Sequence, residues 1–226
     1  MAQRKNAHAL TTAESNRYKN AINTMLADVT NPYGQLVAIH GNMNHNMHGM
    51  NAIGAQRFLP WHRDFLLKLE RALQQIDPAA FIPYWDWTVN RTVPTWIRTF
   101  RPTVIVPGMG TVTVTRRSSI PATKNVATIM SQTTFTNFTN LLEVGPHNQV
   151  HNEIGGPGGT MASIMISPAD PIFWLHHGNV DRLWSQWQAA HPGQNPTLTG
   201  AARIMDPWPE TETQLRSIAT LGYSYI

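Results

Sequence analysis

The chain has 226 residues, of which 42% are hydrophobic, a composition typical of an ordinary globular protein and not of a membrane-spanning or disordered one. It contains no cysteine, which excludes disulfides, zinc ribbons, iron–sulfur clusters and cysteine nucleophiles. Lys and Arg outnumber Asp and Glu by 17 to 13, but the basic residues are scattered, so nucleic acid is not expected as a partner. No run reaches the ~20 apolar residues of a membrane span, so a membrane is not expected either.

The first part of the chain is predicted to be mostly helical. A polar lead-in precedes a helix with Thr12 as its N-cap, and Pro32 begins a second helix that ends near Gly41. The stretch 41–56 is rich in glycine and asparagine and is predicted to be a loop. Pro60 is then expected to begin a third helix. The N-terminus shows no charged segment followed by an apolar one, so the predicted location is cytoplasmic, with export alongside a partner left open.

The remainder of the chain is predicted to add a short hairpin and more helices. Residues 103–115 alternate β-formers around a Pro-Gly pair, which is typical of a β-hairpin. Short helices are expected over 125–130 and 135–142, another from Pro146, and a strong helix over 168–191. The prolines that follow indicate an irregular segment that wraps the surface. No repeat or linker interrupts residues 1–226, so we expect a single, mainly α-helical domain.

Ten histidines in a chain without cysteine point first to a metal site. His147 and His151 are spaced i, i+4, which places both imidazoles on one face of a helix. His176 and His177 are adjacent and diverge by roughly 100° on a helix, so one can ligate a metal while the other packs or hydrogen-bonds behind it. Both lie in an apolar stretch, where an unpartnered imidazole is costly.

A second group of histidines lies in the first part of the chain. His40 ends one predicted helix, His62 begins the next, and His45 and His48 lie in the loop between them. Any three of the four would form a second site. Three neutral nitrogens for each ion, with no thiolate and no carboxylate, suit copper or zinc. Because no obvious carboxylate base for a zinc hydrolase accompanies them, the paired sites indicate two coppers with open positions for dioxygen.

Other side chains near these histidines have candidate roles. Asp181 follows His177 by four residues and is placed to accept an imidazole N–H or to pair with Arg182. Met43, Met47 and Met50 flank the loop histidines, and their soft thioethers suit the delivery of Cu(I), but packing or surface exposure is the simpler explanation of them.

Five stretches resemble the tyrosinase family of type 3 copper proteins, in its short bacterial or archaeal form. They are RFLPWHRDFLLKLERAL (57–73), PYWDW (83–87), HNQVH (147–151), SPADPIFWLHHGNVDRLW (167–184) and the closing LGYSYI. The resemblance implies an all-α fold in which a four-helix bundle holds a dicopper centre, with a small β-hairpin and long loops.

The resemblance also implies three ligands for each copper. The expected ligands are His40, His48 and His62 for the first ion and His147, His151 and His177 for the second. His45 is the alternative to His48, because relatives place the middle ligand closer to the PWHR motif than either histidine lies here. His176 is expected beside the second site, since the second residue of the family's His-His pair is the ligand.

The same resemblance implies further roles and a reaction. Glu143 and Asn148 are expected to hold a water that deprotonates a docking monophenol. Phe173 matches the aromatic residue that packs between the coppers, and Ile164 falls at the gate above them. We expect a copper enzyme that uses dioxygen to hydroxylate monophenols at the ortho position and to oxidise o-diphenols to o-quinones. The alternatives are a catechol or o-aminophenol oxidase and a hemocyanin-like O2-binding protein. The oligomeric state is left open.

Overall fold

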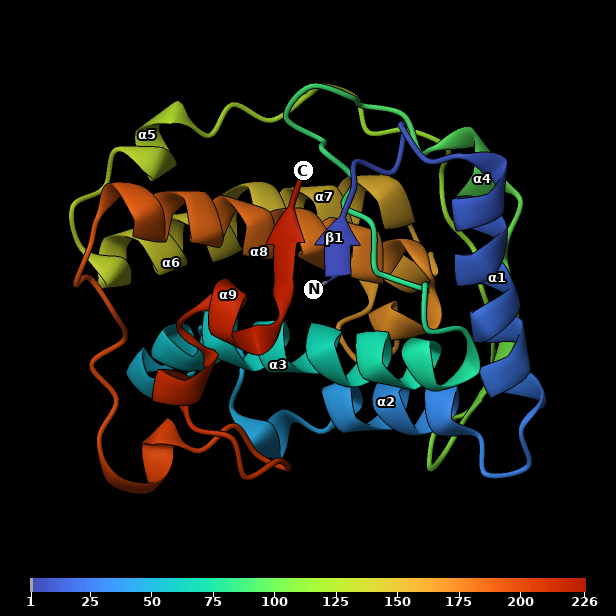
Figure 1. Cartoon of the computed structure of the whole chain (residues 1–226), viewed down its shortest axis with the longest axis horizontal. Helices are drawn as coiled ribbons and strands as arrows, with labels where there is room; N and C mark the ends of the chain where they lie inside the picture. The colour runs from blue at the N-terminus through green and yellow to red at the C-terminus, as the bar shows by residue number, and fades with distance from the viewer. Residues whose placement is uncertain (1) are drawn as a thin grey trace.

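Helices dominate the fold, in agreement with the predicted class, and two small two-stranded sheets complete it (Figure 1). A computed structural model describes residues 2–226. The longer helices are α1 (Thr12–Ala27), α2 (Pro32–Gly41), α3 (Ala52–Ile76), α6 (Phe135–Leu142), α7 (Asn148–Gly155) and α8 (Ile172–Ala190). The short helices are α4 (Thr95–Arg98), α5 (Ala127–Met130), α9 (Ile218–Leu221), the π-helical turn η2 (Glu143–His147) and the 3-10 turns η1 (Met43–His45), η3 (Thr160–Ala162), η4 (Ser167–Ala169), η5 (Gly200–Arg203) and η6 (Glu212–Leu215). The strands are β1 (Ala2–Arg4), β2 (Thr103–Val106), β3 (Gly110–Thr113) and β4 (Tyr223–Tyr225).

The helices form a bundle around α3 and α8. Figure 1 shows these two helices running alongside each other, with α2 flanking α3 and with α6 and α7 flanking α8. Helix α1 packs across α2 and α3. The histidines of both predicted groups lie on α2, α3, α7 and α8 or on the segments between them. The bundle interior is therefore where the two groups can meet.

Helix α3 begins earlier than the sequence indicated. It starts at Ala52, where the Asn51 side chain accepts a hydrogen bond from the Gly54 N–H at 2.9 Å, and Pro60 lies inside it. The prediction that 41–56 is loop throughout and that Pro60 begins the helix was therefore wrong. A proline removes one helical hydrogen bond, but Gly54 to Leu67 are buried on every side, so packing outweighs the lost bond.

The sequence predicted one of the two sheets and not the other. Strands β2 and β3 pair antiparallel, with Val104 opposite Val112, as the predicted hairpin requires. Strands β1 and β4 pair in parallel and bring the two ends of the chain together at the front of the view in Figure 1. Nothing in either three-residue segment indicated this pairing.

The N-cap of α1 differs from the predicted one. It is Thr11, which forms a capping box with Glu14, and not Thr12.

The core is rich in tryptophan. Six tryptophans are fully buried: Trp61, Trp85, Trp87, Trp174, Trp184 and Trp187. They share one hydrophobic core with the leucines of α3, and Trp61 and Trp87 lie against histidine rings of the two groups. Within residues 2–226, no helix combines the length and the apolar character needed to cross a bilayer.

Candidate metal centre

The structure gathers the histidines into two groups of potential metal ligands. One contains His40, His48 and His62, and the other contains His147, His151, His176 and His177. In each group one nitrogen of every residue lies within 4.8 Å of the others. Among residues 2–226 these are the two places where three or more such ligands converge.

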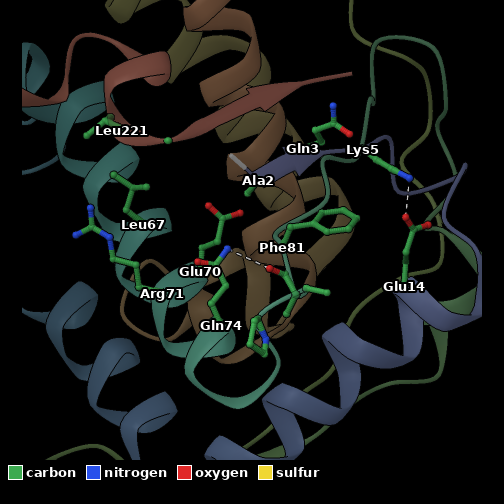
Figure 2. A pocket seen from close by; sticks show the side chains of 14 residues that line it. Ala2, Gln3, Lys5, Glu14, Leu67, Glu70, Arg71, Gln74, Phe81 and Leu221 are labelled. Carbon is green, nitrogen blue, oxygen red and sulfur yellow. Dashed lines mark hydrogen bonds and ion pairs between the residues drawn. The ribbon is translucent and has the colours of Figure 1, made fainter.

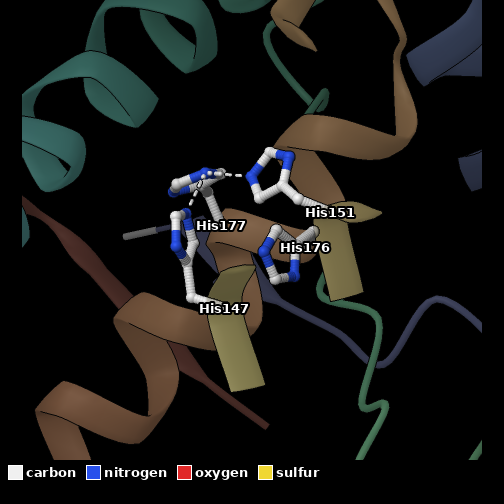
Figure 3. Close-up of side chains that lie close together, drawn as sticks. All are labelled: His147, His151, His176 and His177. Atoms are coloured by element: carbon white, nitrogen blue, oxygen red, sulfur yellow. Dashed lines mark hydrogen bonds between the residues drawn. The ribbon is translucent and has the colours of Figure 1, made fainter. Parts of the chain in front are cut away.

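In the second group three rings converge on one point. His147 ends η2, His151 lies on α7 and His177 lies on α8. The Nε2 atom of His177 lies 3.3 Å from that of His147 and 3.2 Å from that of His151 (Figure 3). Tetrahedral ligation at about 2.0 Å requires nitrogens about 3.3 Å apart, so this trio fits one ion. His176 instead stacks on the His147 ring at a centroid distance of 5.2 Å.

In the first group, two helices and a loop supply the rings. His40 on α2 and His62 on α3 approach with their Nε2 atoms 3.5 Å apart. His48, between η1 and α3, completes the group, with its ring 5.3 Å from that of His40. The Nε2 atom of His48 is buried and has no hydrogen-bond partner among residues 2–226. His45 lies outside the group and stacks on Trp61 at 6.5 Å, so His48 and not His45 converges with His40 and His62.

The two groups face each other across the bundle. The His62 and His177 rings stack at 4.5 Å with an interplanar angle of 13°. Phe173 stacks on His177 at 4.1 Å and meets His40 edge-on at 5.1 Å. Phe173 therefore packs between the groups, at the position that the family resemblance implied.

Backbone carbonyls orient several of these imidazoles. The Nδ1 atom of His62 lies 2.8 Å from the Phe58 carbonyl oxygen, and that of His151 lies 2.8 Å from the Met161 carbonyl oxygen. A carbonyl can only accept, so Nδ1 carries the hydrogen in both rings and Nε2 keeps its lone pair. These Nε2 atoms face the interior of each group, which is the arrangement a metal ligand needs.

Burial keeps the imidazoles neutral. It lowers the pKa of His40, His62, His147 and His177 well below the ordinary value. It lowers the pKa of His151 to about 4. Neutral imidazole is the form that binds metal, and neutral nitrogens without thiolate or carboxylate suit copper. The residues present therefore fit a pair of copper ions.

A pocket of about 110 Å³ opens from the surface onto both groups. Its lining residues are His40, His48, His147, Asn148, His151, Asn152, Met161, Ala162, Ile164 and Ser167. Ile164 is 40% exposed and lines this pocket, and its role as a gate stays a prediction. Two polar residues of the lining were missed. Asn152 follows Asn148 by one helical turn, a spacing that could have revealed it, but no local signal marked Ser167.

The expected water-holding pair is split by the structure. Asn148 lines the pocket, and its Oδ1 atom lies 3.0 Å from His147 Nδ1. Glu143 is buried behind His48 and is absent from that lining. Its Oε1 atom accepts a hydrogen bond from the Gly49 N–H at 2.8 Å. The carboxylate thus faces the loop that carries His48.

The expectation for Asp181 was wrong. Its carboxylate neither accepts from a histidine nor pairs with Arg182, which bonds to Asp86 instead. Asp181 accepts hydrogen bonds from two arginines and two tyrosines: Arg63 Nε at 2.5 Å, Arg4 at 3.3 Å, and the hydroxyls of Tyr223 at 2.7 Å and Tyr225 at 2.6 Å. Spacing along α8 could not reveal this, because three of the partners come from the chain ends.

A larger pocket of about 490 Å³ lies away from the histidines, between β1, α3 and the turn that follows α3 (Figure 2). Three of the four charged side chains that line it, Lys5, Glu14 and Glu70, are held in ion pairs. Lys5 binds Glu14 at 2.6 Å, and Glu70 binds Arg4. Neither of the two metal-ligand groups of residues 2–226 lies there. The chemistry therefore belongs to the histidine pocket.

Comparison with known proteins agrees with this geometry. A family model described as the common central domain of tyrosinase matches residues 30–108 and 107–190. The chain is 31% identical over 266 residues to a tyrosinase of Streptomyces antibioticus, covering 93% of this chain and 94% of that one. It is 33% identical over 211 residues to Hemocyanin 1 of Megathura crenulata, covering 82% of this chain but 6% of that protein.

Solved structures show the same fold. A functional unit of octopus hemocyanin superposes with a TM-score of 0.83 at 25% identity, covering all of this chain and 68% of that one. Latent apple tyrosinase superposes with a TM-score of 0.69 at 20% identity, covering all of this chain and 62% of that one. The helical arrangement around the histidines is thus shared with both.

Proposed function

This chain belongs to the tyrosinase family of type 3 copper proteins, and from that premise we propose that it uses dioxygen to hydroxylate monophenols and to oxidise o-diphenols. The observation that carries the proposal is the pair of histidine groups, each able to offer three ligands to one ion, that face each other beneath one open pocket. A pair of copper ions held there supplies the redox chemistry with dioxygen. One O2 converts a monophenol to an o-quinone and water, or two o-diphenols to two o-quinones and two waters.

The protein positions the ions and the substrate ring. His40, His48 and His62 would hold one copper, and His147, His151 and His177 the other. Four of these six histidines also line the pocket, so a substrate that enters it lies beside both groups. Phe173 fixes the His177 ring by stacking on it, so one ligand orientation is set by packing alone.

The size of the pocket suits a small phenol. Its volume of about 110 Å³ is below that of a cavity of about 150 Å³ that encloses benzene, and because it is open to the surface it can receive one aromatic ring without enclosing it. Ile164 at the rim offers an aliphatic surface to that ring. Asn148 adds a polar contact on the wall beside His147.

Monophenol turnover tests the proposal. The copper-loaded protein should form coloured quinone from tyrosine or a simple phenol without added catechol. Metal analysis should give two copper ions per chain. Asn148→Ala should lower monophenol turnover more than diphenol turnover, because the expected water on the pocket wall assists only phenol deprotonation. Turnover of catechols or o-aminophenols alone would favour the oxidase without hydroxylation.

Oxygen carriage is the second candidate function, because the octopus hemocyanin unit shares the fold. The pocket above the histidines is open to the surface, which favours turnover of an entering phenol. Reversible oxygen binding without any quinone formation would select the carrier function. A partner that delivers copper, and a cytoplasmic location, stay predictions.

A further inference from the structure

Glu143 contacts the ligands of both sites at once. Its backbone carbonyl lies 3.3 Å from His147 Nδ1 in the second group. Its carboxylate Oε1 lies 3.6 Å from His48 Nδ1 in the first group and accepts the Gly49 N–H at 2.8 Å. We propose that Glu143 is a positioning residue, which holds the loop histidine His48 in register with the helix-borne ligands of the second copper.

His48 is the ligand that most needs such support. The other five expected ligands lie on helices or on the helical turn η2, whereas His48 lies on the irregular segment between η1 and α3. That segment begins at Asn46, which has a left-handed φ of 50°, and it exposes Gly49 and Met50. An imidazole on such a loop loses more conformational freedom on ligation than one on a helix. A buried partner reduces that loss by holding the ring beforehand.

The geometry suits a carboxylate behind a metal-bound histidine. His48 Nδ1 faces Glu143, while its Nε2 is buried toward His40 and His62 with no hydrogen-bond partner in the described part of the chain. A carboxylate that attracts the Nδ1–H favours the tautomer whose Nε2 lone pair is free for a metal. Among the six expected ligands, within residues 2–226, His48 is the one paired with a carboxylate.

The loop that carries His48 approaches the Glu143 carboxylate closely at Gly49. A Cβ atom placed on Gly49 would lie 2.8 Å from Glu143 Oε2, closer than side chains normally approach. Glycine therefore allows the loop backbone to reach the carboxylate. On the other side, Glu143 begins the π-helical turn η2, where Gly145 has a non-helical ψ of −112°. The chain therefore kinks at Gly145 between α6 and α7, and across this kink the Glu143 carbonyl lies near His147 Nδ1.

This role differs from water-holding in what it predicts. A residue that only holds a water in the pocket would leave copper binding unchanged and would affect monophenols selectively. A residue that positions His48 would weaken copper binding at the first site and would lower turnover of monophenols and diphenols in the same proportion. Glu143 is 5% exposed and is not part of the pocket lining, which favours the positioning role.

The test compares Glu143→Gln, Glu143→Ala and Gly49→Ala with the control Glu153→Gln. Glu153 is another glutamate of the same region, which pairs with Lys124. Copper per chain is measured by metal analysis, and the affinity of each ion by competition with a Cu(I) chelator. We expect Glu143→Ala to bind one of the two ions about 10- to 100-fold more weakly. Glu143→Gln should show a smaller loss, because one amide oxygen still accepts the Gly49 N–H.

Gly49→Ala approaches the same contact from the exposed loop, so it tests the inference even if a substitution at the buried Glu143 destabilises the fold. It should also weaken one ion, while Glu153→Gln keeps both. Two copper ions with unchanged affinity in Glu143→Ala and Gly49→Ala would overturn the inference, whether or not monophenol turnover falls. The inference rests on the proposed copper centre. If the unsubstituted chain fails to bind two coppers, the proposed function itself is wrong, whatever the variants show.

Discussion

Each imidazole of the centre has two nitrogens, Nδ1 and Nε2. The protein group that Nδ1 faces determines how the ring is oriented and therefore where Nε2 points. Carbonyls of the chain support His62 and His151, and a carboxylate supports His48. The supporting atom selects the tautomer, so the metal-facing nitrogen is prepared before copper arrives. His45 has no place in this scheme, because its ring stacks on Trp61 outside the group.

His48→Ala and His45→Ala should therefore behave differently. Removing His48 leaves one site with two ligands, and we expect the protein to retain about one copper per chain and to lose turnover of both phenol classes. His45→Ala should retain both ions and most of the activity. Metal analysis of the two purified variants decides between them. The reverse outcome would make His45 the ligand.

At the scale of the elements, buried ion pairs set where the ligand-bearing helices begin. Asp170 precedes α8 and accepts the Ile172 N–H at 3.0 Å, while it also binds Arg116 from the segment after β3. Both side chains of this pair are fully buried. The pair joins the hairpin region to the start of the helix that carries His177, so the orientation of α8 depends on it.

Asp170→Ala should destabilise the protein strongly. It leaves the Arg116 guanidinium buried without its partner, which typically costs about 3–5 kcal/mol of unfolding free energy. Asp77→Ala is a suitable control, because Asp77 forms an exposed pair with Arg17 at 3.4 Å that contributes about 1 kcal/mol or less. Denaturant unfolding of both variants measures the difference. Equal losses would contradict the importance of the buried pair.

At the scale of the molecule, the two ends of the chain close the fold around Asp181. Arg4 on β1, Arg63 on α3 and two tyrosines of β4 all bind this carboxylate of α8. Burial alone would raise the pKa of Asp181, but Arg63, Arg4 and the hydroxyls of Tyr225 and Tyr223 together lower that pKa below its usual value. The copper ligands likewise come from both parts of the chain, so metal binding and the global fold are linked.

Tyr223→Phe tests the closure of the chain ends. It removes one hydroxyl from the Asp181 carboxylate while keeping the buried ring. A lost hydrogen bond to a charged group should lower the unfolding free energy by about 1.5–3 kcal/mol. Thermal or denaturant unfolding measures this, with Tyr84→Phe as a control, since the Tyr84 hydroxyl bonds only to the carbonyl of the last residue, Ile226. Similar losses in both variants would argue against a special role for Asp181.

Copper removal should lower global stability. Each ion binds ligands that the unfolded chain does not hold together, so free copper at 100 times the dissociation constant adds about 2.7 kcal/mol per site. Unfolding curves with and without a chelator should differ by this order. The difference should vanish in a His62→Ala, His177→Ala double variant, which lacks one ligand at each site. Identical curves for the loaded and chelated protein would contradict a centre built from both parts of the chain.

Local spacing was enough to predict the helical class, the hairpin and the shared face of His147 and His151. The i, i+4 relation of His147 and His151 follows from helix geometry wherever the helix lies. The family motifs added His62 and His177 to the expected ligands, and the resemblance as a whole added His40, which lies in none of those motifs.

Long-range packing decided the rest. The choice of His48 over His45, the position of Glu143 behind the loop, the partners of Asp181 and the β1–β4 pairing all join residues far apart in sequence. An irregular loop has no periodicity from which side-chain directions can be derived, and a buried carboxylate takes whichever cations and hydroxyls the folded chain brings to it. Helix α3 begins before Pro60 for the same reason, since burial on all sides outweighs one missing hydrogen bond.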